Sequence, residues 1–143
     1  MKISTKGRYA LRMMIDLAQN NGGGFVPLKD ISERQGISKK YLELIVSSLH
    51  NSDLLSAGRG FQGGYQLAKP PEQITVGEIL RLTEGSLAPV ACLDRDPAGC
   101  ERRDSCPTLF IWQELDRRIE EYLDSVTLRD ILDRQASSFD YMI

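Results

Sequence analysis

Three cysteines are the residues of this chain with the clearest capacity for chemistry. They lie in one short stretch, with seven residues between the first pair and five between the second: Cys92, Cys100 and Cys106. Thiolates are the preferred ligands of iron–sulfur clusters, which usually take four protein ligands. The spacing therefore predicts, as the leading use of these thiols, a cluster completed by one non-cysteine ligand.

Three other uses of the cysteines remain open from the residues alone. Arg102 and Arg103 could favour the thiolate of a neighbouring cysteine, which suits a thiol redox switch that forms a disulfide. Structural zinc loops usually pair their ligands as Cys-x2-4-Cys, and the sequence holds no such pair. Inert buried cysteines usually have apolar neighbours, and only Cys92 has them.

The cysteines fall in a stretch, 86–107, whose Pro, Gly and Asp content predicts irregular structure, so the flanking elements must position it. Before it, the capping-box pattern of 75–78 predicts a short helix. After it, a helix beginning at Pro107 is predicted. Its apolar residues follow heptad spacing: Trp112, Leu115, Ile119, Tyr122 and Val126. Such a narrow stripe is typical of a coiled coil and predicts a homodimer.

The first part of the chain predicts a helix-turn-helix followed by a wing. A first helix over 4–20 would bury Leu11, Met14, Ile15 and Ala18. A second would run from Pro27 to Gly36, and a third, capped by Ser38, carries an apolar stripe: Leu42, Ile45, Val46 and Leu49. Two short strands, 54–56 and 64–67, flank a glycine-rich tip. We therefore expect a winged helix.

The predicted fold is mainly α with a small β-wing. Residues 1–70 would form the winged helix-turn-helix DNA-binding region, and 71–106 a short helix and the cluster-binding loop. Residues 107–135 would form the dimerisation helix and a short C-terminal helix capped by Thr127, with 136–143 as a frayed tail. Residues 1–70 hold 10 Lys and Arg against 5 Asp and Glu, whereas 71–143 hold 8 against 15. This asymmetry suits a basic head that meets DNA phosphates.

The residues expected to contact double-stranded DNA lie in three places. Phosphate contacts fix the register on DNA, while contacts with base edges read its sequence. Glu43 could accept a hydrogen bond from cytosine N4, and Leu44 could touch a thymine methyl. The other expected contacts are Ser4, Thr5 and Lys6 at the first helix, Lys39 and Lys40 on the third, and Arg59 and Gln62 in the wing.

Other classes of function find little support. The first twelve residues intersperse basic side chains and contain no unbroken apolar run, so we expect a cytoplasmic protein without a membrane segment. The sequence lacks a P-loop, a GxGxxG motif and a catalytic triad pattern, which argues against an enzyme. The single histidine, His50, is expected at the end of the third helix rather than as a metal ligand.

Three further stretches carry a family resemblance: 4–10, 31–38, and the wing motif Arg59-Gly60-x-x-Gly63-Gly64-Tyr65-x-Leu67-Ala68-Lys69. Together with the cysteines they closely resemble the IscR branch of bacterial winged-helix iron–sulfur regulators. The resemblance implies a homodimer with crossed long helices and a cluster ligated by the three cysteines near the interface. It also implies DNA reading by Tyr41, Glu43 and Arg59, and control, chiefly repression, of iron–sulfur biogenesis genes according to cluster occupancy.

Two departures from that pattern concern the cluster. The family pattern has five residues between its first two cysteines, where this chain has seven. It also has a histidine three places after the third cysteine, where this chain has Leu109. The fourth ligand is therefore open: a loop carboxylate, a group from the other subunit, or an exogenous molecule. Relatives carry 2Fe–2S or 4Fe–4S clusters, and some sense thiols without a cluster; we expect 2Fe–2S.

Overall fold

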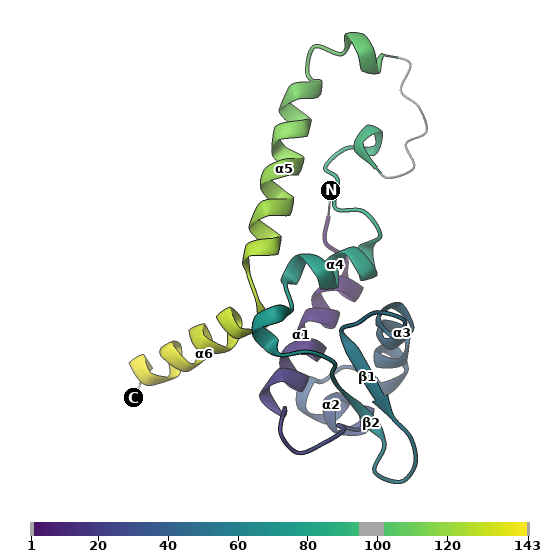
Figure 1. The fold of residues 1–143 in the computed structure, drawn as a ribbon, viewed down its shortest axis with the longest axis vertical. Coiled ribbons are helices and arrows are strands. Elements are labelled where there is room, and N and C mark those ends of the chain that lie inside the picture. The colour runs from purple at the N-terminus through teal and green to yellow at the C-terminus, as the bar shows by residue number, and fades with distance from the viewer. Residues whose placement is uncertain (1, 95–101, 143) are drawn as a thin grey trace.

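The computed structural model describes residues 2–94 and 102–142 of the chain, and it is mainly helical with a two-stranded wing (Figure 1). The predicted fold class is confirmed. Three helices open the chain: α1 (Thr5–Gln19), α2 (Leu28–Gln35) and α3 (Lys39–Leu49). The wing follows as β1 (Leu55–Gly58) and β2 (Gly64–Leu67), then α4 (Val76–Glu84), α5 (Leu109–Ser125) and α6 (Leu128–Met142). Three single turns of 3₁₀ helix connect them: η1 (Pro71–Gln73), η2 (Ala91–Leu93) and η3 (Arg103–Ser105).

The turn between α2 and α3 forms as its residue types predict. Gly36 ends α2 with φ of 65°, a left-handed conformation that glycine adopts without a steric penalty. Two residues later, the Ser38 hydroxyl caps α3 by accepting a hydrogen bond from the Tyr41 N–H at 3.1 Å. These two signals fix the angle at which α3 leaves α2.

The helices of the head, which we define as residues 2–70, enclose an apolar core. The stripe predicted for α3 is buried as expected, and Leu28 and Ile31 of α2 join it. The face predicted for α1 is partly wrong, because its most buried residues are Ala10, Met13, Met14 and Leu17. Leu11 and Ile15 are only half-buried, at the edge of the core. Helix α1 contacts α2, α3, α4, α6 and β2, so it is buried on more than one side.

The wing is attached to the head by a third stretch of extended chain. Strands β1 and β2 pair antiparallel, with Leu55 opposite Leu67 and Gly58 opposite Gly64. Val26 extends this pairing, since its N–H donates to the Tyr65 carbonyl at 2.8 Å and its carbonyl accepts from the Tyr65 N–H at 2.9 Å. A Cβ at Gly64 would lie 2.3 Å from the Val26 carbonyl oxygen, so only glycine permits this approach.

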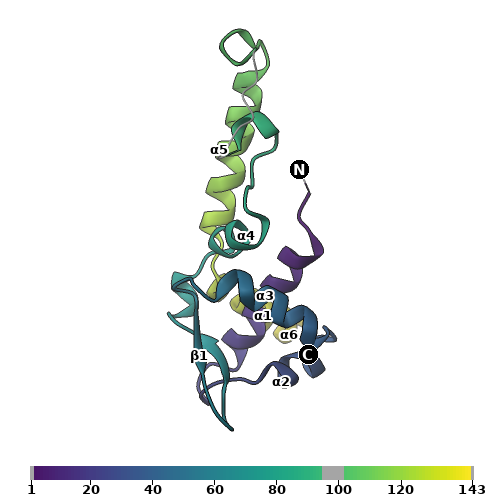
Figure 2. The ribbon, with the colours of Figure 1, turned by 90° about the vertical axis from the view of Figure 1, so that its right-hand side faces the viewer.

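Helix α5 stands out from the rest of the molecule, and Figures 1 and 2 show it rising away from the head at the end opposite the wing. It begins at Leu109 rather than at the expected Pro107, with Thr108 as the preceding residue. None of its residues is buried within the protomer. We call α5 and the cysteine loop (86–107) together the arm.

Helix α6 returns to the head after α5 and runs to Met142, beyond the point at Gln135 where we expected a frayed tail. Thr127 caps it through a reciprocal pair of hydrogen bonds with Asp130, of 2.9 and 3.1 Å. Leu128, the first residue of α6, is fully buried in the same core cluster as Ile74 and the three N-terminal helices. Residues outside the head, well beyond position 70, therefore complete its core. No helix in the described part of the chain has the length and hydrophobicity needed to cross a membrane.

Candidate DNA-binding surface and cysteine loop

Helix α3 presents the side chains that the sequence assigned to base reading. Lys39, Lys40, Glu43 and Leu44 are all exposed, whereas the apolar stripe of α3 is buried. Leu44 is 51% exposed although it is a large hydrophobic residue. An amphipathic helix with one cation pair at its start and an exposed Glu–Leu pair behind it has the chemistry that major-groove reading requires.

Tyr41 lies beside these residues but is half-buried, because an aromatic contact fixes it. Its ring meets that of Tyr9 edge-on, with the centroids 5.5 Å apart and the planes at 68°. The Arg12 guanidinium lies over the other ring of the pair, 5.2 Å from the Tyr9 centroid. Arg12 in turn bonds the side chain and backbone carbonyl of Gln35. Tyr41 is thus oriented by a chain of contacts that starts on α1.

This chain of contacts ends at Asp16, a buried carboxylate in the last turn of α1 that the sequence analysis did not identify. Asp16 is 1% exposed and accepts hydrogen bonds from Arg34 at 2.8 and 3.0 Å. The Gln35 amide donates to the same carboxylate at 3.0 Å. The hydrogen bond that Arg34 donates to Asp16 is also the main cause that raises the pKa of Arg34. The signal was available, since an aspartate inside an apolar helical stretch needs a cationic partner.

The N-terminus of α1 is already in contact with an anionic group. The backbone N–H and the hydroxyl of Ser4 both donate to the Glu84 carboxylate, at 3.0 and 2.6 Å. Ser4 is therefore engaged within the chain and is less available for the DNA phosphate we expected there. Thr5 is exposed and accepts a hydrogen bond from Arg8, an exposed cation that the sequence analysis did not single out, while Lys6 is half-buried.

The wing and the start of α3 enclose a shallow groove. Its walls are Gly58, Gly60, Gly63 and Gly64 of the wing on one side and the cations Lys29 and Lys39 on the other. Arg59 and Gln62 are both exposed at the tip beside it. Backbone amides of glycines and lysine ammonium groups are suitable partners for phosphates. The structure therefore places Lys39, one of the expected contacts, beside the glycines of the wing.

The cysteine loop lies at the other end of the long axis (Figure 1). Cys92 is in η2 and Cys106 follows η3, and both are half-buried free thiols. Cys100 lies outside the described residues. The described start of the loop is held by Leu87, which is buried against Val76 and Leu80, and by a 2.6 Å hydrogen bond from Ser86 to Asp94.

Cys106 is the described cysteine with a perturbed acidity. Its thiol lies 3.4 Å from the Thr108 hydroxyl, and this hydrogen bond is the main cause that lowers the pKa of Cys106. The backbone N–H of Thr108 and the charge of Arg102 act in the same direction. A thiolate is the form that ligates iron or attacks a disulfide, so Cys106 is suited to either chemistry.

Two residues considered as possible ligands offer none to the cysteine loop. His50 forms the C-terminal cap of α3, as the sequence predicted, and is exposed on the head. Leu109 is the first residue of α5, and its aliphatic side chain offers no ligand atom. Among residues 2–94 and 102–142, no three His, Cys, Asp or Glu side chains come close enough together to hold a metal ion. Cys100 lies outside these residues.

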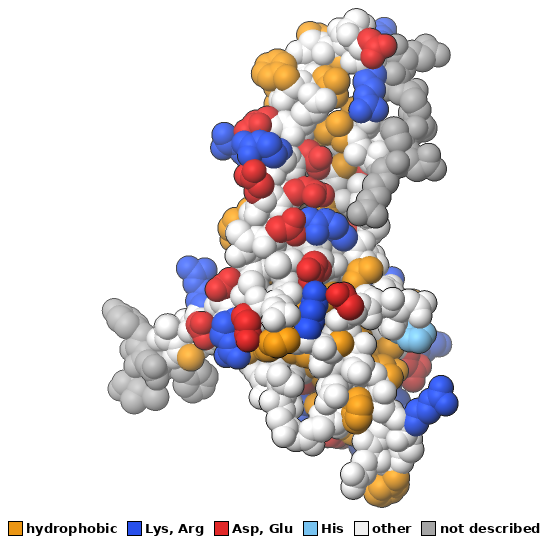
Figure 3. Space-filling model, viewed as in Figure 1, with side chains coloured by type: hydrophobic (Ala, Val, Ile, Leu, Met, Phe, Trp, Pro, Cys, Tyr) orange, Lys and Arg blue, Asp and Glu red, His pale blue; other side chains and the backbone are white. Residues whose placement is uncertain are grey.

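One face of α5 is apolar and open. Ile119 and Leu123 pack toward α4 beside Val76, Leu80 and Leu87. Away from that contact, large hydrophobic residues are exposed, with Leu115 at 41% and Tyr122 at 67%; the others are Phe110 and Ile111. Figure 3 shows hydrophobic side chains along this rising part of the molecule, among alternating acidic and basic groups.

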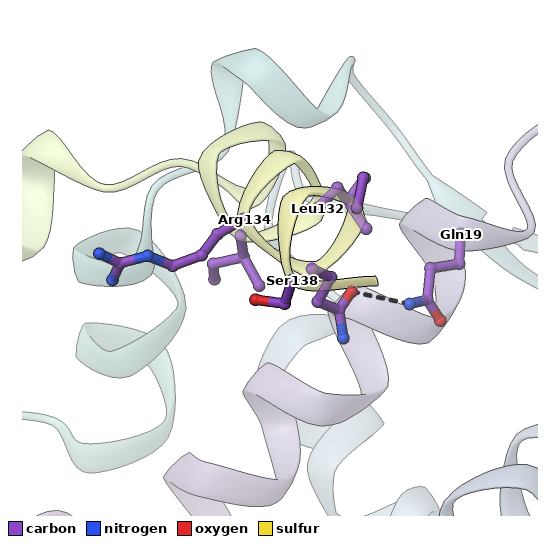
Figure 4. A pocket seen from close by; sticks show the side chains of 7 residues that line it. Gln19, Leu132, Arg134 and Ser138 are labelled. Carbon is purple, nitrogen blue, oxygen red and sulfur yellow. Dashed lines mark hydrogen bonds between the residues drawn. The ribbon is translucent and has the colours of Figure 1, made fainter. Parts of the chain in front are cut away.

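A separate hollow of about 600 Å³ lies between the end of α1 and α6. Figure 4 shows Leu132 and Gln19 on its two sides, with the Gln19 amide donating to Gln135 at 2.9 Å. Arg134 points away from that hydrogen bond, and its guanidinium is the only ionisable group of the lining. The hollow shares no residue with the α3–wing surface or the cysteine loop, and we assign it no ligand.

The chain is similar to known regulators over nearly its whole length. The Rrf2 family model, described as an iron-dependent transcriptional regulator, matches residues 3–134. The HTH-type transcriptional regulator IscR of Escherichia coli (strain K12 / DH10B) is 41% identical over 135 residues, covering 94% of this chain and 82% of that protein. IscR of Sodalis glossinidius (strain morsitans) is 39% identical, covering 94% and 81%.

Two solved structures are also similar. T. potens IscR superimposes with a TM-score of 0.73 at 41% identity, covering 94% of this chain and 88% of that chain. CymR, described as the global cysteine regulator of B. subtilis, superimposes with a TM-score of 0.75 at 41% identity, covering 94% and 98%. This chain therefore shares its fold with both regulators.

Proposed function

Because this chain belongs to the Rrf2 family of transcriptional regulators, which are winged-helix DNA-binding proteins rather than enzymes, we propose that it senses an iron–sulfur cluster. In this proposal Cys92, Cys100 and Cys106 ligate the cluster, of the 2Fe–2S type. The protein acts as a homodimer that represses iron–sulfur biogenesis genes according to whether the cluster is bound. The IscR relatives and the grouping of the three thiols in one loop support this assignment.

The donor set of the loop fits such a cluster. Three thiols are the ligands that iron–sulfur clusters prefer, and the lowered pKa of Cys106 favours the ligating thiolate. When bound, the cluster would supply a response to iron and oxidants that the side chains lack. The fourth ligand stays open, because Leu109 cannot serve and Asp94 already accepts a hydrogen bond from Ser86. Asp104, in η3 and exposed, is the described loop carboxylate nearest in sequence to Cys106.

The link from the cluster to DNA would run through the dimer. The exposed apolar face of α5 would pair with a second copy, since burying large hydrophobic side chains is the main driving force for such association. Two copies of α3 would then read half-sites about one helical turn of DNA apart. Leu87 and the Arg81 bonds to Glu120 and Asp124 join the cysteine loop, α4 and α5 into one unit that can transmit a change in the loop.

Anaerobic reconstitution of the purified full-length chain with iron and sulfide tests the cluster. We expect visible absorption of a cluster and about two iron and two sulfide per protomer for a 2Fe–2S centre. Substituting any one of the three cysteines by alanine should abolish most of the bound iron. His50→Ala is the matched control, because it removes another potential ligand that the structure places on the head.

Failure to retain iron in the unaltered protein would contradict the proposal. So would full iron retention in the three cysteine variants. A second candidate function, a thiol sensor without a cluster, then becomes the better assignment. It is favoured by the similarity to CymR and by the lowered pKa of Cys106, and it predicts a reversible disulfide that mass spectrometry would locate.

DNA binding by the wing is tested separately with Arg59→Ala. We propose that Arg59 contacts DNA together with Thr5, Lys6, Lys39, Lys40, Tyr41, Glu43, Leu44 and Gln62. Removing its charge should weaken binding to a duplex selected in vitro by the unaltered protein, and should reduce the salt dependence by about one counterion. Arg129→Ala, on α6, is the control and should bind normally. Equal affinities for the two variants would exclude the Arg59 contact.

A further inference from the structure

Phe61 is the most exposed large hydrophobic residue in the described part of the chain. Its exposed fraction is 105%, compared with 69% for Phe110 and 67% for Tyr122. A phenylalanine that stays wholly in water contributes nothing to the folded state through burial, so its packing cannot explain its presence. Figure 3 shows a hydrophobic side chain at the end of the molecule where Figure 1 draws the β1–β2 loop.

The loop holds Phe61 in a defined position. The Gly63 N–H donates to the Gly60 carbonyl at 3.0 Å, which closes a four-residue turn with Phe61 and Gln62 as its two central residues. Gly60 has φ of 92°, and a Cβ at Gly63 would lie 2.6 Å from the Gly58 carbonyl oxygen. These glycines let the two strands of the wing approach closely at the tip, so the side chains of Phe61 and Gln62 project outward.

The surroundings of the tip indicate what Phe61 meets. Beside it lies the groove between the wing and α3, with Lys29 and Lys39 on one wall. Arg59 and Gln62, its neighbours in the tip, are exposed and polar. A phosphate strand held by these lysines would place the tip on the far side of that strand, in the adjoining groove of the duplex. An apolar protein partner would fit such a cationic, polar setting poorly.

We propose that Phe61 is an apolar wedge that enters the minor groove of the bound DNA and partly unstacks one base step. Apolar side chains that enter the minor groove in this way kink the duplex, so the sequences that deform most easily are preferred. Phe61 thereby contributes to site choice through DNA deformability, while Glu43 and Leu44 face base edges. This inference rests on the proposed DNA-binding function and adds a specificity-determining residue to it.

Phe61→Ala tests the wedge in the full-length protein, on a duplex selected in vitro by the unaltered protein. We expect binding about tenfold weaker, with the slope of affinity against salt unchanged, because no charge is lost. Substituting 2-aminopurine at successive positions of the duplex should show one step whose fluorescence rises with the unaltered protein and stays low with Phe61→Ala. Phe61→Leu, which keeps an apolar side chain, should recover most of the affinity.

The controls separate this inference from the function on which it rests. Phe61 has no contacts to lose, so the thermal unfolding of Phe61→Ala should match that of the unaltered protein. Equal affinity and equal fluorescence for Phe61→Ala and the unaltered protein would overturn the wedge and leave DNA binding intact. Weakening accompanied by a lower salt slope, as expected for Arg59→Ala, would also overturn it. If the unaltered protein selects no duplex, the proposed function fails first.

Discussion

The head and the arm of this molecule differ in how completely one protomer buries its own apolar side chains. In the head, α3 buries its apolar stripe and α1 buries Ala10, Met13, Met14 and Leu17, while the buried Asp16 accepts three hydrogen bonds from Arg34 and Gln35. In the arm, α5 has no buried residue and leaves Leu115 and Tyr122 open to solvent. The head buries most of its apolar residues within one chain, whereas the arm leaves large apolar residues uncovered.

This difference supports the proposed placement of DNA reading in the head and of sensing in the arm. Reading DNA requires side chains held in fixed positions, and the network behind Tyr41 provides that. Sensing requires a region whose state can change at low cost, and a helix with few internal contacts meets that requirement. The comparison leads to three predictions, in order of decreasing effect.

The first prediction concerns the open face of α5. Leu115→Asp would place a charge in the proposed dimer interface, where desolvation without a partner costs several kcal/mol. We expect the dimer dissociation constant to rise by about a hundredfold or more. Sedimentation velocity over a range of concentrations measures it. Gln113→Asp is the control, because Gln113 is exposed on the opposite side of α5. Equal dimer dissociation constants for the two variants would show that the apolar face of α5 does not form the interface.

The second prediction concerns the Asp16 network in the head. Asp16→Ala removes a buried carboxylate that three donors contact at 2.8 to 3.0 Å. Because Arg34 is partly exposed and can regain water, we expect a loss of about 2–3 kcal/mol in the free energy of unfolding. Urea denaturation measures it. Asp53→Ala removes an ion pair with Lys69 on the surface and should lower the free energy of unfolding by less than about 0.5 kcal/mol. Equal losses for the two variants would show that Asp16 does not stabilise the head.

The smallest expected effect is a pH dependence of the stability of α5, caused by ion pairs on the surface of the arm. Hydrogen bonds from Arg117 and Arg118 lower the pKa of Glu114 to about 2. Since this pKa lies below the ordinary value of 4.5 for glutamate, the contribution to the stability of α5 is complete only at pH values above 4.5 and is lost as the pH falls toward 2. NMR titration of the Glu114 carboxyl group measures the pKa, and Glu114→Gln should remove this part of the pH dependence. A midpoint near the ordinary value for glutamate would show that the ion pairs do not persist in solution.

Local signals in the sequence predicted much of the head. The stripe of α3, its Ser38 cap and the left-handed Gly36 depend on neighbouring residues, so they can be recognised without tertiary information. The wing was found because glycine clusters mark tight hairpins, although β1 begins at Leu55 rather than 54 and runs to Gly58. The exposed side of α3 followed directly from its buried side.

Features that depend on distant residues were missed. The rotated face of α1 reflects packing by five other elements, which no period within α1 reveals. The Ser4–Glu84 contact joins residues 80 positions apart, so the N-terminus of α1 could not be recognised as occupied. The length of α6 also escaped the sequence analysis, because Ser137, Ser138 and the polar composition after Gln135 weaken a helical pattern without breaking it.

The position of Leu128 has a consequence for how the protein is made. A chain emerges from the ribosome with its N-terminus first, and domains usually begin to fold in that order. Here a fully buried residue of the core belongs to α6, so the core stays open until nearly the whole chain has been synthesised. The apolar face of α5 emerges before the core can close. A chain terminated before Leu128 would expose both surfaces at once and should be removed by proteases, so only complete chains would enter the regulatory pool.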